Sequence, residues 1–169
     1  GQASLGNDVD IPILADLSRK HAKLRRHGEG YVIEPVGKVC LGGQVITGLT
    51  LLSDGDEISL GNSVRMTFQQ PHALSATARL DLVSRHKTQP TADAVLLMAE
   101  SCVLGPNRQN HIVCRSWSDD VVLFRQGSEL FCRAMESIEV DGELCDGRGR
   151  IGTNSRVEGS DFSLSLEEV

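Results

Sequence analysis

Aromatic side chains are scarce in this chain, at 4% of 169 residues, and long hydrophobic runs are absent. The longest fully apolar stretch, Ala94 to Ala99, is far too short to span a bilayer. The chain has no P-loop, no G-x-S-x-G elbow and no G-x-G-x-x-G after a strand, and its five histidines are scattered. These absences argue against a membrane span in this stretch and against an enzyme.

A disulfide framework and a zinc site are also disfavoured. The cysteines are odd in number and irregularly spaced, and no C-x-x-C pair occurs among Cys40, Cys102, Cys114, Cys132 and Cys145. We expect reduced, mostly buried thiols in a cytoplasmic protein that needs no metal or other cofactor.

The formal net charge of −6 disfavours general binding of DNA or RNA, because an acidic chain repels a phosphate polymer. The charge is nevertheless uneven. The segment from Ser18 to His27 contains no acid and carries five basic residues, namely Arg19, Lys20, Lys23, Arg25 and Arg26. A local basic patch on an acidic body suits a small, discrete anion.

Hydrophobic residues alternate with polar ones at a period of two, which predicts strands with one buried face. The pattern is clear in Val64–Phe68, Ala78–Leu82 and Phe162–Leu166. Further strands are expected at Tyr31–Ile33, Val39–Leu41, Ile58–Leu60, Ala94–Met98, Ile112–Cys114, Val121–Arg125, Leu130–Arg133 and Ile138–Val140. Many short strands indicate an all-β protein built from antiparallel sandwiches.

One segment leaves an alternative open. Leu14, Leu17, His21 and Leu24 fall at near-helical spacing, so Ile13 to Arg26 could instead form an amphipathic helix. Such a helix would contradict a loop at Ser18–His21.

The two halves of the chain look weakly repeated. Leu5-Gly6 is similar to Leu104-Gly105, and Leu41-Gly42-Gly43 is similar to Val140-Asp141-Gly142, in the same order. A polar stretch with few apolar residues, 84–93, separates the halves. We therefore expect two small β-sandwich domains in tandem, 1–87 and 88–169.

The first half resembles the forkhead-associated (FHA) family over about residues 3 to 70. Ser18-Arg19-Lys20-His21 matches the S-R-x-H signature, and Leu52 to Gly61 matches L-x-D-G-D-x-I-x-L-G. Gly6 and Asp10-Ile11 stand where the family has its first glycine and an Asp-Ile strand. The resemblance implies an FHA/SMAD-like sandwich, and it places the second half as a degenerate FHA-like domain, in a bacterial protein.

The resemblance implies a phosphopeptide site made by Ser18, Arg19, Asn7 and Lys38, with Gly6 and His21 supporting the loop. A phosphate group is recognised by guanidinium, hydroxyl and N–H donors, which Ser18 and Arg19 can supply. The family usually has Arg where Asn7 stands. It also has an Asn between its middle strands. The corresponding segment here, Val36 to Gly43, lacks that Asn, and Lys38 in this segment is a substitute cation.

The expected function is therefore binding of phosphothreonine peptides or proteins in a Ser/Thr kinase signalling pathway. The alternative is a phosphate-independent protein–protein interaction scaffold on the same fold. The second half carries Trp117 and Asp119-Asp120 instead of S-R-x-H, and the acidic pair would repel phosphate. Only Gly1 to Leu5 precede Gly6, so the first strand is expected to be absent or supplied by another copy, in a strand-exchanged homo-oligomer.

Overall fold

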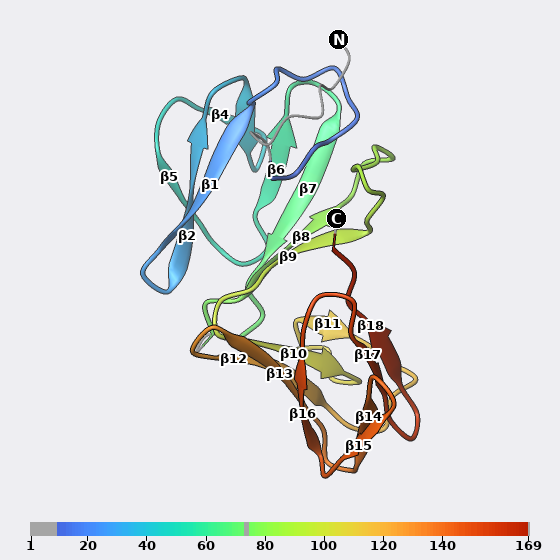
Figure 1. Cartoon of the computed structure of the whole chain (residues 1–169). Helices are drawn as coiled ribbons and strands as arrows, with labels where there is room; N and C mark the ends of the chain where they lie inside the picture. Colours follow the sequence, from blue (N-terminus) through green and yellow to red (C-terminus); the bar gives the residue numbers. More distant parts are fainter. Residues whose placement is uncertain (1–9, 73–74, 169) are drawn as a thin grey trace. The chain divides into compact units, whose positions relative to one another are not determined.

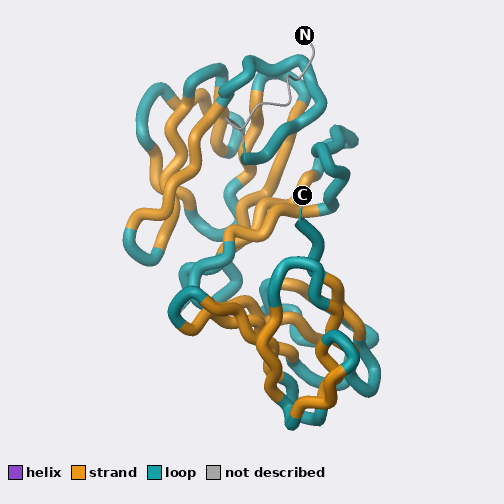
Figure 2. Tube along the Cα trace, in the orientation of Figure 1, coloured by secondary structure: helices purple, strands orange, loops and turns teal. Residues whose placement is uncertain are grey.

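The computed structural model describes residues 10–72 and 75–168, and residues 1–9, 73–74 and 169 fall outside it. Over these ranges the secondary structure is strands and connecting loops only (Figures 1 and 2). The all-β class predicted from the alternation is confirmed. No helix that could cross a membrane occurs in the described part of the chain.

The chain divides into two compact units, Gly1–Leu97 and Met98–Val169. The division falls later than the expected boundary after residue 87. The intervening segment pairs with the first unit: an isolated bridge joins Ile13 to Thr88, and Ala94–Leu97 forms an antiparallel strand against Ala78–Leu82. The expected boundary lay in a polar stretch, and polar composition does not exclude backbone pairing.

The first unit consists of two antiparallel sheets. One has the strand order β1-β2-β5 and the other the order β4-β3-β6-β7-β8-β9. The strands are β1 (Ala22–His27), β2 (Gly30–Pro35), β3 (Val39–Leu41), β4 (Gln44–Ile46), β5 (Thr50–Leu52), β6 (Glu57–Leu60), β7 (Val64–Gln69), β8 (Ala78–Leu82) and β9 (Ala94–Leu97).

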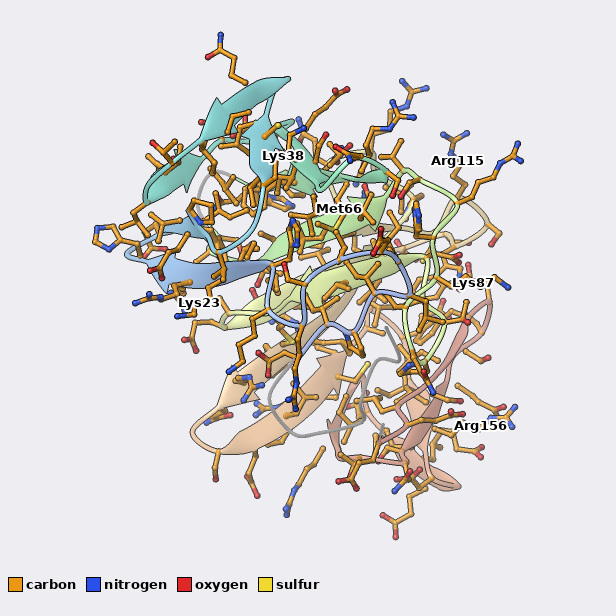
Figure 3. All side chains as sticks on the ribbon, turned by 90° about the horizontal axis from the view of Figure 1, so that it is seen from above. Lys23, Lys38, Met66, Lys87, Arg115 and Arg156 are labelled. Carbon is orange, nitrogen blue, oxygen red and sulfur yellow. The ribbon has the colours of Figure 1, made fainter. Side chains whose placement is uncertain are left out.

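Alternating side chains from both sheets form one core. Ile33 of β2 packs in the same cluster as Ile58 of β6 and Phe68 of β7, and all three are fully buried. Met66 of β7, labelled in Figure 3, belongs to this core as well. The arrangement is a β-sandwich, as the period-two pattern predicts.

The helix alternative for Ile13 to Arg26 is wrong. Residues 22–27 form β1, which pairs with β2 from Ala22 opposite Pro35 to His27 opposite Gly30. Leu14, which a helix would place on its apolar face, is 48% exposed. Cross-strand pairing to β2 therefore overrides the local helical spacing, and Ser18–His21 lies in the loop that leads into β1.

The second unit is also a sandwich of two sheets. Their strand orders are β11-β10-β12-β13-β16 and β15-β14-β17-β18. The strands are β10 (Ser101–Gly105), β11 (Ile112–Val113), β12 (Val121–Gln126), β13 (Glu129–Arg133), β14 (Ile138–Val140), β15 (Glu143–Cys145), β16 (Arg148–Ile151), β17 (Arg156–Glu158) and β18 (Ser163–Ser165). Val121, Cys132 and Val157 lie at the centre of its core.

The strand order of the second unit repeats that of the first. The set β12-β13-β16 corresponds to β1-β2-β5, and β15-β14-β17-β18 corresponds to β4-β3-β6-β7. The separation is 99 residues between Ala22 at the start of β1 and Val121 at the start of β12 (121 minus 22). Two β-sandwiches that share the order of these seven strands thus stand in tandem, and the units can be compared position by position.

The G-x-G-x-x-G spacing from Gly147 to Gly152 lies along β16 itself. A Cβ at Gly149 would stand 2.5 Å from Val140 Cγ2 and 3.2 Å from Cys145 Sγ. This glycine therefore permits close packing between the two sheets. It does not form a nucleotide-binding turn, because the motif itself runs as a strand and the next element is the strand β17 and not a helix.

Candidate functional site

The loop Ser18–His21 is fastened to the first unit through the His21 side chain. The ring Nε2 lies 3.0 Å from the backbone carbonyl of Lys38, and the ring Nδ1 lies 3.0 Å from the Ser18 hydroxyl and 3.2 Å from the Ser18 N–H. The backbone carbonyl of His21 also accepts hydrogen bonds from the N–H groups of Val36 and Gly37. One residue thus connects the loop to the chain between β2 and β3.

The partners of His21 select its tautomer. A carbonyl oxygen can only accept, so Nε2 must carry the proton that points at Lys38. In the neutral ring Nδ1 is then an acceptor for the Ser18 N–H and hydroxyl. Because Nδ1 has one lone pair, these two donors compete for it, and either one holds Ser18 at the head of the loop.

Gly37 provides the space for the imidazole. A Cβ at this position would lie 2.5 Å from Cε1 and 2.7 Å from Nδ1 of His21, which is closer than real contacts allow. The His21 ring therefore lies directly against the Gly37 backbone. Gly37 contributes to the loop, and the S-R-x-H motif alone does not identify it. The sequence gives no signal for this role, because only the fold brings Gly37 next to His21.

Lys38 lies at the same end of the sandwich as Ser18, as the two contacts of His21 show. Its side chain is exposed, and Nζ donates to Oδ1 of Asn62 at 3.2 Å. Its carbonyl also accepts from the Gly61 N–H at 2.9 Å. Gly61 and Asn62 form the turn after β6, which directly follows the D-G-D block, and they were not among the expected site residues.

Arg19 is exposed beside Ser18, at the start of the basic segment. Further along β1, Arg25 forms an ion pair with Glu34 of β2, and Arg26 Nε donates to the Gly28 carbonyl at 3.1 Å. Lys23, labelled in Figure 3 with Lys38, is exposed on the same strand. The basic segment is therefore partly neutralised in β1, and Arg19 keeps an exposed guanidinium next to the loop.

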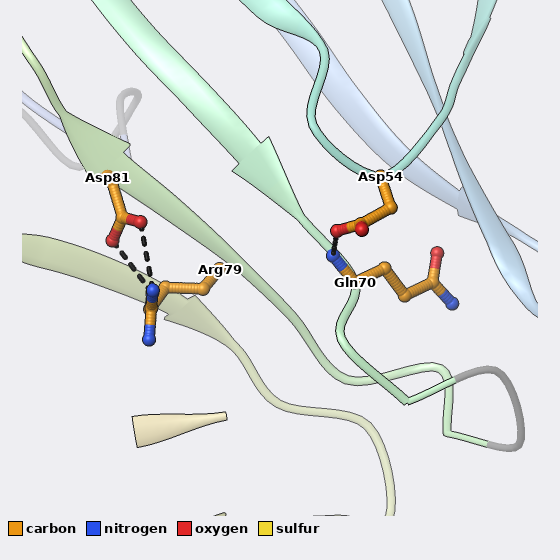
Figure 4. Close-up of polar contacts among 4 residues, drawn as sticks. All are labelled: Asp54, Gln70, Arg79 and Asp81. Atoms are coloured by element: carbon orange, nitrogen blue, oxygen red, sulfur yellow. Dashed lines mark hydrogen bonds and ion pairs between the residues drawn. The ribbon is translucent and has the colours of Figure 1, made fainter. Parts of the chain in front are cut away.

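The D-G-D block forms a turn held by its own carboxylates. Asp56 accepts from the Ser53 N–H at 2.8 Å, and Asp54 accepts from the Gln70 N–H at 2.7 Å. Figure 4 shows the latter contact, next to the Arg79–Asp81 ion pair of β8. Each carboxylate thus satisfies a backbone donor where the chain turns, which is a structural role.

The expected site residues are only partly brought together in the described structure. Ser18, His21 and Lys38 are joined by hydrogen bonds, with Arg19 next to Ser18. Asn7 and Gly6 lie outside the described residues, as does the expectation of a missing or exchanged first strand at Gly1 to Leu5.

The equivalent loop of the second unit is filled by its own side chains. Trp117, 99 positions after Ser18, packs against Phe162 with ring centroids 4.9 Å apart. Asp161 accepts from the Ser118 N–H, and hydrogen bonds from the Ser118 side chain and then from its N–H lower the pKa of the Asp161 carboxyl. Asp120 stands at the position of His21 and accepts from Asn110 Nδ2 at 2.6 Å. Neither the hydroxyl nor the imidazole of the first unit has a counterpart here.

A family model of the FHA domain matches residues 1–61. Residues 1–61 are thus similar to the FHA family. No curated protein and no solved structure matches the chain. The match includes the Ser18–His21 loop and the D-G-D turn and ends at Gly61, the residue that donates to the Lys38 carbonyl. FHA domains in general are phosphothreonine-binding modules for protein–protein interaction, not enzymes.

Proposed function

We propose that the FHA domain of this chain binds a phosphothreonine peptide through Ser18 and Arg19, with Lys38 as a further cation. The observation that carries the proposal is the hydrogen-bonded group of Ser18, His21 and Lys38 at the head of a basic segment. With Arg19 next to Ser18 in the chain, a hydroxyl, a guanidinium and an ammonium group are then available to one ligand, which supports the proposal.

The chemistry of these groups suits a phosphate monoester. Phosphate carries about two negative charges and three acceptor oxygens near neutral pH. The guanidinium of Arg19 can donate to two of these oxygens at once, and the exposed Ser18 hydroxyl can donate to another. If the Ser18 N–H occupies Nδ1 of His21, the hydroxyl proton is available for the ligand.

The position of Lys38 compensates in part for Asn7, which stands where the family usually has Arg. In the described part of the chain, Lys38 Nζ donates to the neutral amide oxygen of Asn62 at 3.2 Å, which leaves two further N–H groups for a ligand. An ammonium group is a point charge without the bidentate geometry of guanidinium. We expect affinity below that of an FHA domain with the arginine.

The second unit is proposed not to bind phosphate. Trp117 and Asp120 replace the serine and histidine of the loop, and Asp119 adds a further negative charge. Fixed carboxylates at this place oppose a phosphate dianion. The tandem protein is then a signalling adaptor with one phosphate-reading domain, in a Ser/Thr kinase pathway.

The test is a titration of the full chain with a phosphothreonine peptide library and with the same peptides unphosphorylated, followed by fluorescence anisotropy. Removal of a charge-assisted hydrogen bond costs about 1.5–3 kcal/mol. Arg19→Ala should therefore weaken binding by roughly tenfold or more, and Ser18→Ala should also weaken it. Arg156→Ala removes an exposed arginine of β17 and is the matched control, with no expected effect.

Equal binding of phosphorylated and unphosphorylated peptides would contradict the proposal, as would parental affinity in both site variants. The first of these results would instead support the phosphate-independent scaffold. Arg156→Ala weakening binding as much as Arg19→Ala would show that net charge alone determines affinity.

A further inference from the structure

Two of the four phenylalanines of this aromatic-poor chain lie outside both cores. Phe124 of β12 and Phe131 of β13 stack with ring centroids 5.6 Å apart and an interplanar angle of 21°. Both side chains are partly exposed. Folding of the second unit is driven by burial elsewhere, so these rings are available for another role.

The register of the strands places the two rings on the outer face of the sheet. Leu123 and Cys132, which alternate with Phe124 and Phe131, belong to the core of the unit. Phe124 is directly opposite Phe131, and Phe131 is directly opposite Arg150 of β16. Residues that face each other across antiparallel strands share one side of a sheet.

Three arginines surround the rings on this side. Arg133 of β13 is opposite Arg148 of β16, and the Arg148 guanidinium carbon lies 4.5 Å from the Phe131 centroid and 5.2 Å from that of Phe124. The single acid in the same rows is Glu129, which forms an ion pair with Arg150 at 3.0 Å. We call Phe124, Phe131, Arg133, Arg148 and Arg150 the Phe-Arg face.

The FHA unit shows that the fold does not require this composition. At the corresponding positions of the first unit, Arg25 stands for Phe124, Val32 for Phe131 and Leu49 for Arg148. On that surface Arg25 pairs with Glu34, Val32 is buried, and Leu49 is exposed, so it carries neither stacked rings nor a cluster of arginines. The aromatic and cationic surface is therefore particular to the second unit.

We propose that the Phe-Arg face docks an acidic segment of a partner protein that also carries apolar side chains. Aromatic residues and arginine are the residue types that dominate binding energy at protein interfaces. The planar guanidinium groups fit carboxylates in a bidentate manner, and the stacked rings offer an apolar floor between them. The positive balance of three arginines against one glutamate, in a chain of net charge −6, selects an acidic occupant.

A single-stranded nucleic acid is the competing occupant, because bases stack on aromatic rings. The net charge of the whole chain opposes a long phosphate polymer more than a short acidic peptide. The phosphothreonine site proposed above lies on the other unit, so the two proposals can be separated with variants of either one.

The test is fluorescence anisotropy of the full chain with three labelled probes. They are a peptide of glutamates flanking leucine and phenylalanine, the same peptide with glutamine in place of glutamate, and an oligothymidylate. Arg148→Glu reverses the central charge of the Phe-Arg face, and Arg148→Lys keeps the charge without the bidentate fork. Arg156→Glu is the matched control on the other sheet of the unit, and Arg19→Ala disables the site on the FHA domain.

We expect the acidic peptide to bind and the glutamine peptide to bind at least about tenfold more weakly. Arg148→Glu should reduce affinity for the acidic peptide by about tenfold or more, as for an interface hot spot, and Arg148→Lys by less. Arg156→Glu and Arg19→Ala should leave it unchanged. Unaltered thermal unfolding of Arg148→Glu ensures that a loss of binding reports on the surface.

Three results would overturn the proposal. The acidic peptide could bind no better than the glutamine peptide, or it could bind the Arg148→Glu and Arg156→Glu variants equally well. The oligothymidylate could also bind more tightly than the acidic peptide and with the same dependence on Arg148, which would make the Phe-Arg face a nucleic-acid surface.

Discussion

Replacement of Gly37 by alanine should disrupt the Ser18–His21 loop through a single added methyl group. Gly37 has no positive φ, so alanine is compatible with its backbone, and the effect must come from the new contact. The added Cβ would meet three atoms of the His21 ring at 2.5–2.8 Å. The ring must move, because the Gly37 backbone is held by its N–H bond to the His21 carbonyl at 2.8 Å.

The magnitude follows from the contacts that the moving ring gives up. His21 would lose the bond from Nε2 to the Lys38 carbonyl and one bond from Ser18 to Nδ1. Each such bond contributes about 0.5–1.5 kcal/mol, so the variant should be destabilised by roughly 1–3 kcal/mol. For a domain of this size, about 1 kcal/mol corresponds to a fall of roughly 4–8 °C in Tm.

The assay is thermal and urea unfolding of the full chain, together with titration of the phosphothreonine peptide. Gly48→Ala is the control, because Gly48 has open space around an ideal Cβ and no positive φ. The decisive comparison is a double-mutant cycle. In a His21→Ala background the clash is gone, so Gly37→Ala should cost almost nothing there.

An equal cost of Gly37→Ala with and without the His21 side chain would refute the reasoning, because the methyl group would then act on something other than the imidazole. So would a Gly37→Ala variant that is as stable as Gly48→Ala. Phosphopeptide affinity should fall along with stability, since Ser18 depends on the same ring for its position.

Three further predictions concern stability and thiol reactivity. Phe68→Ala should destabilise the FHA unit by about 3–5 kcal/mol in urea unfolding, because the ring is fully buried against Tyr31. Burial raises the pKa of the Cys132 thiol to about 11, so alkylation of the native protein near pH 8 should label Cys145 before Cys132, as mass spectrometry can show. The Arg156 N–H and the Ser155 hydroxyl lower the pKa of Asp141 below 3.8. The stability that Asp141 contributes is therefore complete above its unfolded-state pKa of 3.8, and it is lost as the pH falls through the lower pKa of the folded state. Asp141→Asn removes this titration, so Tm should fall less steeply with decreasing pH in the acid range than it does in the parent protein.

Strands with a clear period of two were predictable from the sequence, and the β7 and β8 predictions were correct to within a residue or two. The tandem repeat was predictable for a physical reason as well. Gly42-Gly43 and Asp141-Gly142 all have positive φ, so both hairpins need the same unusual backbone and keep Gly or Asp there. For detecting the repeat, short matches of turn residues were therefore more informative than the pattern of apolar residues.

The strands that were not predicted lack an informative side-chain pattern. β1 reads as Ala-Lys-Leu-Arg-Arg-His, and its sheet position depends on pairing with β2, which local spacing does not encode. β16 reads as Arg-Gly-Arg-Ile, where glycine takes the place of an inward side chain because Val140 is too close. Both strands are determined by tertiary contacts.

The candidate site was predictable as far as the motif extends. S-R-x-H pointed to Ser18 and Arg19, and the structure adds the segment on which His21 rests, namely Gly37 and Lys38. These residues are 16 and 17 positions further along the chain than His21 (37 minus 21 and 38 minus 21). A contact between segments so far apart depends on the register of β1 with β2 and appears only when the fold is known.

Comparison of the two units distinguishes residues that stabilise the sandwich fold from residues that position the Ser18–His21 loop. In the first unit the Ser53 N–H is satisfied by Asp56, and at the same position of the second unit the Gly152 N–H is satisfied by the Ser155 hydroxyl at 3.0 Å. The turn is thus kept with a different side chain, and in both units a side-chain oxygen three residues further along the chain accepts from the same backbone donor. His21 has no such replacement, because Asp120 turns to Asn110 instead. A sandwich of the same topology forms without the imidazole, so His21 is required for the position of Ser18 and not for the fold.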